Sequence, residues 1–146
     1  MKINVLTVSK KDTLFSEPIS EYTKRLSKYV DLTTENIVHS DKDSESEKLL
    51  SKIKPSDYVV LLDERGSIIK STEFAEFLEN RQNESTQRVV FVIGGAYGVS
   101  ETVMNRANYT LSFGSMVWPH ALCYTMLVEQ LYRSYTILNG VPYHNR

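Results

Sequence analysis

Residues 89–98 read VVFVIGGAYG and decide the fold. An apolar run, Val89 to Ile93, leads without interruption into a turn rich in glycine. An apolar run of this length is typical of a strand that is buried on both faces, as in a parallel sheet. Glycines at its carboxyl end let the backbone turn sharply and approach a ligand closely. Because ligands of open α/β sheets bind outside the carboxyl ends of the strands, we expect a small-molecule site at this turn.

The rest of the chain alternates strand and helix patterns. The expected strands span residues 3–8, 32–38, 58–62, 89–93 and 109–113. Five helices are expected. The first carries Phe15, Ile19, Tyr22, Leu26 and Tyr29 on one face, and the second is a short helix around Leu49. The third begins at Ser71 or Thr72 as its N-cap, the fourth begins at Ser100, and the fifth runs from Pro119 to Asn139. This alternation predicts an α/β fold, a mainly parallel sheet with helices on both faces, in one domain of residues 1–146.

The glycine spacing alone does not identify the ligand. It is G-G-x-x-G, which differs from the dinucleotide-binding pattern G-x-G-x-x-G, and the chain has no phosphate-binding G-x-x-x-x-G-K-[ST] motif. On this motif alone, a plain tight turn is the better interpretation of Gly94, Gly95 and Gly98. The segments that follow them carry more information.

Three further motifs follow in order: LSFGSMVWPH at 111–120, EQLYR at 129–133 and PYH at 142–144. Together with IGGAYG, this order resembles the SPOUT-superfamily methyltransferases that modify N3 of a pseudouridine in bacterial large-subunit ribosomal RNA. The resemblance covers nearly the whole chain, and the carboxyl half carries its specific motifs. It implies S-adenosylmethionine as cofactor, ribosomal RNA as substrate, a deep trefoil knot in the carboxyl-terminal part, and a homodimer with its active sites at the subunit interface.

The resemblance also implies which residues form the site. The cofactor would be held by Leu62, Gly94, Gly95, Gly98, Phe113, Gly114, Ser115, Met116, Val117 and Trp118. The residues implied for catalysis are His120, Arg133, Tyr143 and His144. Adenine needs an apolar slot and backbone hydrogen-bonding groups, which these strand-end loops would supply. Taken without the resemblance, Leu62 is an ordinary core residue, and Arg133 is a structural ion-pair partner of Glu129 one turn earlier.

The tail after Gly140 is expected to project from the last helix, because it holds little apolar mass. Its aromatic and basic groups, with Arg146 as the last, suit stacking on an RNA base. The last helix is apolar around most of its circumference, so it needs more than one surface to bury against. We expect one surface to be the sheet and the other a second copy of the chain, with Leu131 or Tyr135 at that interface.

Composition narrows the class of protein. The chain has 146 residues, 41% of them apolar, and a formal net charge of −1, which argues against a general nucleic-acid coat protein. A modest basic face, formed by Lys10, Lys11, Lys24, Arg25 and Lys28, would suit local reading of a structured RNA, although a solvated helix surface explains it equally well. No signal peptide or membrane span is evident, which favours the cytoplasm.

No metal site is expected, because the histidines and the single cysteine have unrelated spacings. Cys123 lies in an apolar helical pattern and is interpreted as a buried structural thiol.

Some positions depart from the family pattern. Tyr124 stands where members usually have Arg, residues 63–66 carry two extra charges, and the region between the second strand and the second helix is shorter than usual. These departures fit a diverged paralogue. They leave two alternatives open: an RNA-binding dimer that has lost efficient catalysis, and a methyltransferase with an altered RNA target. A third alternative is a different small α/β enzyme that binds a nucleotide at residues 94–98.

Overall fold

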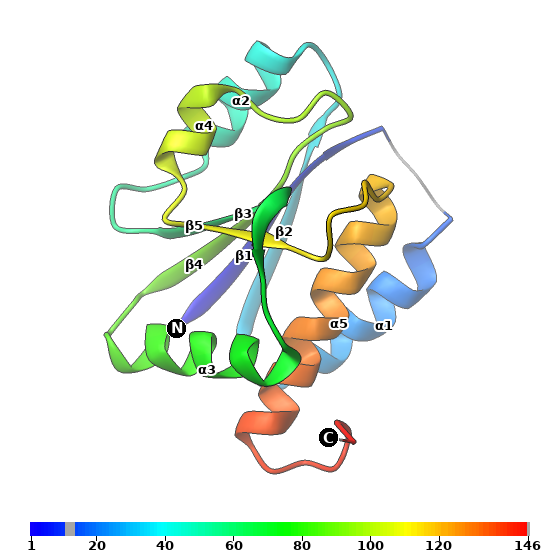
Figure 1. Cartoon of the computed structure of the whole chain (residues 1–146), viewed down its shortest axis with the longest axis vertical. Coiled ribbons are helices and arrows are strands. Elements are labelled where there is room, and N and C mark those ends of the chain that lie inside the picture. Colours follow the sequence, from blue (N-terminus) through cyan, green and yellow to red (C-terminus); the bar gives the residue numbers. More distant parts are fainter. Residues whose placement is uncertain (11–13, 146) are drawn as a thin grey trace.

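The computed structural model describes residues 1–10 and 14–145, which contain a five-stranded sheet (Figure 1). Its strands are β1 Lys2–Ser9, β2 Asp31–Val38, β3 Tyr58–Ile68, β4 Arg88–Ile93 and β5 Tyr109–Ser112. They lie in the order β2-β1-β4-β3-β5, and every pairing is parallel. Residues 89–93 thus lie in the central strand, as the apolar run predicted.

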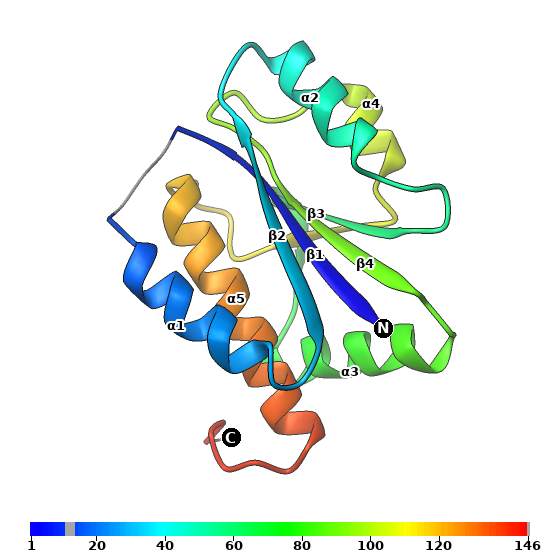
Figure 2. The same ribbon diagram turned by 180° about the vertical axis from the view of Figure 1, so that it is seen from behind.

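Helices cover both faces of this sheet. They are α1 Ser16–Leu26, α2 Lys42–Ser51, α3 Ser71–Asn83, α4 Glu101–Arg106 and α5 His120–Leu138. Helices α1, α3 and α5 pack on one face, and α2 and α4 pack on the other (Figures 1 and 2). In β4, Val89, Phe91 and Ile93 join the first core, whereas Val90 and Val92 join the second. Burial on both faces explains why this strand is apolar at every position after Arg88. The predicted α/β class is confirmed, while the knot stays a prediction from the resemblance.

Helix α5 is buried mainly by other parts of the same chain. It packs against α1, α3 and the sheet, and Leu131 and Tyr135 are only 0% and 6% exposed. Elements of the same chain therefore provide the several surfaces against which the apolar sides of α5 are buried. The inference that a second copy must cover Leu131 or Tyr135 is wrong, because both side chains point into the core of one subunit. The homodimer itself stays a prediction. Among the described residues, no helix is both long and apolar enough to cross a membrane.

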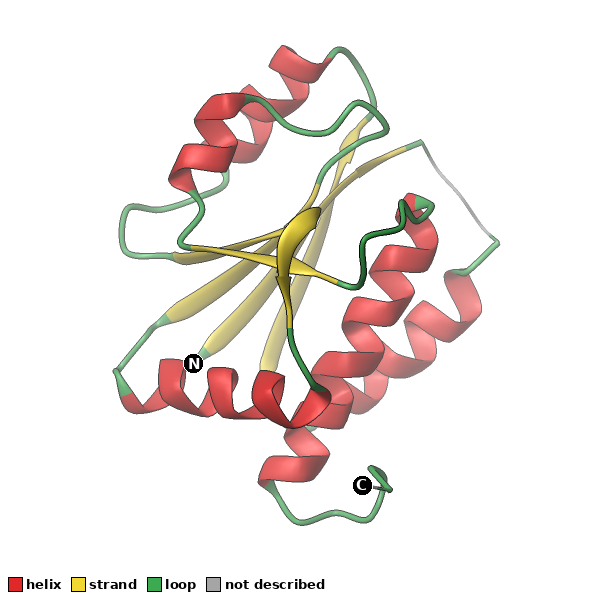
Figure 3. Cartoon of the chain, in the orientation of Figure 1, coloured by secondary structure: helices red, strands yellow, loops and turns green. Residues whose placement is uncertain are grey.

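Strand β3 is longer than the apolar pattern predicted. After Leu62 its register with β5 shifts, and Ser67 and Ile68 form a second set of pairs (Figure 3). Gly66 permits this bulge, because a Cβ there would lie 2.6 Å from the carbonyl oxygen of Thr110. The apolar pattern ends at Asp63 because apolar side chains mark only the buried part of the strand. Beyond it the strand continues through backbone hydrogen bonds, at positions that are mostly exposed.

Two helix starts also differ by a residue from the sequence pattern. The N-cap of α3 is Lys70, whose N–H donates to the Glu73 carboxylate at 2.8 Å, so neither Ser71 nor Thr72 caps it. Pro119 is the N-cap of α5 instead of its first residue. The predicted cap of α4 is confirmed, because the Ser100 side chain accepts a hydrogen bond from a backbone N–H in the first turn.

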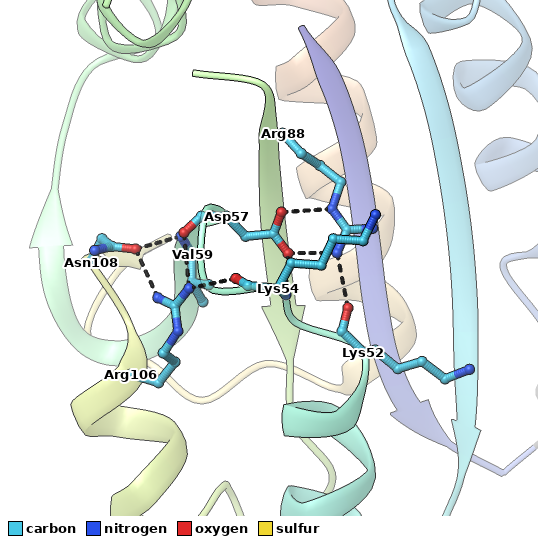
Figure 4. Close-up of polar contacts among 7 residues, drawn as sticks. All are labelled: Lys52, Lys54, Asp57, Val59, Arg88, Arg106 and Asn108. Atoms are coloured by element: carbon cyan, nitrogen blue, oxygen red, sulfur yellow. Dashed lines mark hydrogen bonds and ion pairs between the residues drawn. The ribbon is translucent and has the colours of Figure 1, made fainter. Parts of the chain in front are cut away.

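The amino-terminal edge of the sheet is held by a charged network (Figure 4). Arg88 donates to the two carboxylate oxygens of Asp57 at 2.9 and 2.5 Å, and to the carbonyl of Lys52 at 2.9 Å. Arg106 donates to the carbonyls of Lys54 and Asp57, each at 3.0 Å. Burial alone would raise the pKa of Asp57, but its hydrogen bonds from Arg88 and the Lys54 N–H outweigh burial and hold the pKa below its ordinary value. The network fixes the turn that leads into β3.

Candidate functional site

A cleft of about 1060 Å³ lies at the opposite, carboxyl-terminal edge of the sheet. It is bounded by the ends of β1 and β4, by the middle of β3 at residues 61–65, by the loop after β5 and by the first turns of α5. Of the residues implied for the cofactor, the cleft is lined by Leu62, Gly94, Gly95, Gly98, Phe113, Gly114, Met116, Val117 and Trp118. His120 also lines it. Residues from separate parts of the sequence meet here because the carboxyl ends of parallel strands share one edge.

The glycine turn after β4 forms one wall of the cleft. Gly98 has a φ of 76°, a conformation that side chains with a Cβ rarely adopt, and its N–H donates to the Gly95 carbonyl at 2.9 Å. A Cβ on Gly94 would lie 2.7 Å from the Val99 side chain. A branched side chain at Gly94 would therefore collide with Val99 and distort the turn itself.

The loop after β5 forms the facing wall. The Ser112 hydroxyl fixes its start by accepting from the Gly114 N–H at 3.0 Å and donating to the Gly114 carbonyl at 2.8 Å. Met116 and Val117 line the cleft yet are 72% and 80% exposed. Ser115 is exposed and does not line the cleft, in contrast to the other residues implied for this loop. The loop therefore offers apolar surface that a bound ligand would cover.

An ion pair between two residues of β3 lies at the edge of the cleft. Arg65 donates to the two carboxylate oxygens of Asp63, each at 2.8 Å. These hydrogen bonds lower the pKa of Asp63, despite burial that opposes the change, and raise the pKa of Arg65. Two of the charges noted at residues 63–66 thus neutralise each other, and Arg65 is not an unpaired cation.

The first turns of α5 contribute His120 and Cys123 to the floor of the cleft. The His120 ring lies edge-on to Tyr124, with ring centroids 6.4 Å apart. Burial raises the pKa of the Cys123 thiol to about 11, so the thiolate is scarce at neutral pH, which agrees with a structural role. Tyr124 packs against the main core, and burial raises the pKa of its hydroxyl. The chain thus accommodates Tyr124 as a packing residue beside the site.

The other residues implied for catalysis form a separate cluster near the carboxyl end of α5. Arg133 donates to Glu129 at 2.6 and 3.0 Å, and its guanidinium lies 3.1 Å from a ring nitrogen of His144. The Tyr143 hydroxyl donates to the same Glu129 oxygen at 2.9 Å. The tail therefore folds back onto α5, and the expectation that it projects freely is wrong. Thirteen residues of helix separate His120 from Arg133, which is roughly 20 Å.

Two candidate RNA-binding cations, Lys11 and Arg146, lie outside the described residues. The sequence reasoning also missed two cleft residues, His39 and Tyr97. Their positions in the sequence could have identified them as cleft residues, since His39 directly follows the end of β2 and Tyr97 lies within the glycine turn.

The cleft fits the cofactor that the resemblance implies. It combines apolar walls from Leu62 and Met116 with the backbone of two strand-end turns, which suits a nucleoside with a polar edge. Its volume is also sufficient for a ligand of this size. Within residues 1–10 and 14–145, no group of three or more His, Cys, Asp or Glu side chains is placed to hold a metal ion.

Two solved structures, titled as a methylase and a methyltransferase, share this fold. A probable methylase family protein from Haemophilus influenzae superposes with a TM-score of 0.58 at 11% identity, over 99% of this chain and 70% of that one. The SpoU methyltransferase AviRb from Streptomyces viridochromogenes, solved in complex with the cofactor AdoMet, gives a TM-score of 0.50 at 16% identity, over 90% of this chain and 57% of that one. At these identities the likeness establishes the fold.

Sequence comparison establishes the family. The family described as "Predicted SPOUT methyltransferase" matches residues 1–144. The chain is 40% identical over 158 aligned positions to ribosomal RNA large subunit methyltransferase H of Clostridium botulinum (strain Alaska E43 / Type E3), covering 99% of both chains. It is 38% identical to the protein of the same name from Carboxydothermus hydrogenoformans, again over 99% of both. The match argues against an unrelated nucleotide-binding enzyme, and the chain belongs to the SPOUT methyltransferase family.

Proposed function

We propose that this protein transfers a methyl group from S-adenosylmethionine to N3 of a pseudouridine in large-subunit ribosomal RNA. The observation that carries the proposal is the cleft, in which the glycine turn and the loop after β5 face each other at the carboxyl edge of the sheet. Relatives that share 38–40% of their residues with this chain are named ribosomal RNA large subunit methyltransferase H. The reaction is carried out in the cytoplasm by a single domain.

The cofactor supplies a methyl group that is already activated by its sulfonium, so the chain's task is mainly positioning. Leu62 and Met116 would hold the adenine, and the backbone at Gly94 would bind the rest of the cofactor. His120, at the entrance of α5, contacts the target base. Ser115 lies in the same loop without lining the cleft, so its contact with the cofactor stays a prediction from the resemblance. These residues exclude water from the methyl group and present it to the RNA.

The cluster of Arg133, Tyr143 and His144 lies too far from this cleft to serve it within one subunit. We propose that it serves the cleft of the other subunit in a homodimer, where Tyr143 and His144 grip the RNA. Burial, together with Tyr22 and Glu129, raises the pKa of Tyr143, so its hydroxyl stays protonated and able to donate at neutral pH. Light scattering at micromolar concentration tests the dimer, and a monomer mass would contradict it.

Methyl transfer to ribosomes from a strain that lacks the modification tests the proposed activity directly. Calorimetric titration with S-adenosylmethionine, run in parallel, separates loss of cofactor binding from loss of chemistry. Transfer to N3 of one pseudouridine supports the proposal, and tight cofactor binding without transfer would contradict it. The Tyr124→Arg variant serves as an internal comparison, because a gain in transfer would show that this departure weakens the enzyme.

A further inference from the structure

Two aromatic side chains and a cation lie at the end of the cleft farthest from β5. His39 follows β2, Tyr97 lies in the glycine turn, and Lys10 follows β1, and all three line the cleft. Strands β1 and β2, which Lys10 and His39 follow, lie on the other side of β4 from β5. The His39 and Tyr97 rings are 6.0 Å apart with an interplanar angle of 32°. They form a continuous surface that the proposed cofactor contacts do not use.

A buried carboxylate fixes one of these rings. Glu45 is 1% exposed, and one of its oxygens lies 2.7 Å from Nδ1 of His39 and accepts from the Ser40 N–H at 2.8 Å. The short contact means that Nδ1 donates its proton to the carboxylate, which sets the orientation of the imidazole ring. The other Glu45 oxygen lies beside Gly95 in the glycine turn, where an added Cβ would be 2.8 Å away. The Glu45 carboxylate thus lies between the His39 loop and the turn that carries Tyr97.

Tyr97 is exposed although it is large and aromatic. Its side chain is 72% exposed, while its neighbour His39 is held at the cleft wall by Glu45. Because Glu45 already sets the orientation of the His39 ring, a nucleic-acid base that stacks there would cost little entropy of ordering at that ring. The exposed ammonium of Lys10 lies on the same wall and suits a phosphate.

We propose that Tyr97 and His39 form a ledge on which a base of the substrate RNA, next to the target nucleotide, stacks, with Lys10 facing its phosphate. This inference rests on the proposed function, because it concerns the RNA of that reaction. A nucleotide that enters the cleft leaves its neighbour in the strand without a stacking partner, and the ledge replaces that partner. Tyr97 and His39 are accordingly positioning residues, distinct from those that hold the cofactor.

Tyr97→Ala is the decisive variant, with Tyr97→Phe as its matched control. Loss of one base–aromatic stack should raise KM for the RNA substrate roughly 5- to 100-fold, with a smaller effect on kcat. Tyr97→Phe keeps the ring and should behave like the parent. His39→Ala should show a weaker effect of the same kind. The affinity for S-adenosylmethionine and the melting temperature should be unchanged in Tyr97→Ala, since the side chain is exposed.

Binding of a ribosomal RNA fragment, measured by fluorescence anisotropy without cofactor, tests the ledge independently of methyl transfer. If the parent does not methylate ribosomal RNA but Tyr97→Ala still loses affinity for the fragment, the proposed function fails and the ledge stands. If the parent is active and Tyr97→Ala has the same KM and the same fragment affinity, the ledge is overturned. A loss of cofactor affinity in Tyr97→Ala would also overturn it, because that result would place Tyr97 in the cofactor site.

Discussion

Replacing Arg88 by Met should destabilise the protein by leaving a buried carboxylate without its cation. The Asp57 side chain is 2% exposed, and Arg88 supplies two hydrogen bonds to it. Removing one partner of a buried ion pair costs about 3 kcal/mol or more. With a typical urea dependence of about 2 kcal/mol per molar, the unfolding midpoint should fall by about 1.5 M. The Lys54 N–H, which donates to the same carboxylate at 2.7 Å, is the remaining partner and keeps the loss from being larger.

The penalty should also depend on pH. In the parent, the pKa of Asp57 is held below its ordinary value, so its ionised form stabilises the fold above about pH 4 and this contribution is lost as pH falls through the folded pKa. In Arg88→Met, burial is no longer opposed by Arg88 and raises the pKa of Asp57. The Asp57 carboxylate therefore becomes protonated at a higher pH in the variant than in the parent. The difference in unfolding free energy should be largest at pH 7 and should narrow toward pH 4.

Urea unfolding followed by circular dichroism at pH 7 and pH 4 measures both effects. Arg106→Met is the matched control, because Arg106 donates to carbonyls at 3.0 Å and its loss leaves no buried charge. It should cost about 1 kcal/mol and show little of the same pH dependence. If Arg88→Met unfolds within about 0.5 kcal/mol of the parent at pH 7, the pair behaves like an exposed ion pair and the reasoning is refuted.

Three further outcomes are expected at the cleft and the tail. Gly95→Ala should lower stability by about 1 to 3 kcal/mol, since its Cβ would lie 2.8 Å from a Glu45 oxygen; an unchanged melting temperature would show that Glu45 yields freely. Cys123, with its pKa raised to about 11, should react with iodoacetamide at pH 8 on the order of 100-fold more slowly than a free thiol, and a rate near that of a free thiol would contradict its burial. Tyr143→Phe removes the 2.9 Å hydrogen bond to Glu129 and should reduce methyl transfer while sparing cofactor affinity; transfer at the parent rate would argue against a role for the tail hydroxyl.

The sequence by itself determined the fold class and the place of the cleft. The apolar run that becomes β4 indicates burial on both faces, and Gly98 is typical of a turn with positive φ. Both features can therefore be predicted from the local sequence. Parallel strands direct their carboxyl ends to one edge, and for that reason the segments after Leu62, Ile93 and Ser112 could be expected to meet, although the first of them continues as strand β3. The resemblance then supplied the identity of the ligand, which these local patterns did not contain.

Only the tertiary structure decided which distant side chains touch. The strand order β2-β1-β4-β3-β5 brings the segment after β2 near the turn after β4, so that His39 and Tyr97 share one wall of the cleft and the buried Glu45 contacts His39. The same packing buries Tyr135 inside one subunit and folds the tail onto Glu129, where the pattern of apolar residues had suggested an outer face and a free end. The spacing of apolar residues indicates how much of a helix is buried but not which element packs against it. That element depends on the order of the strands and on the lengths of loops elsewhere in the chain.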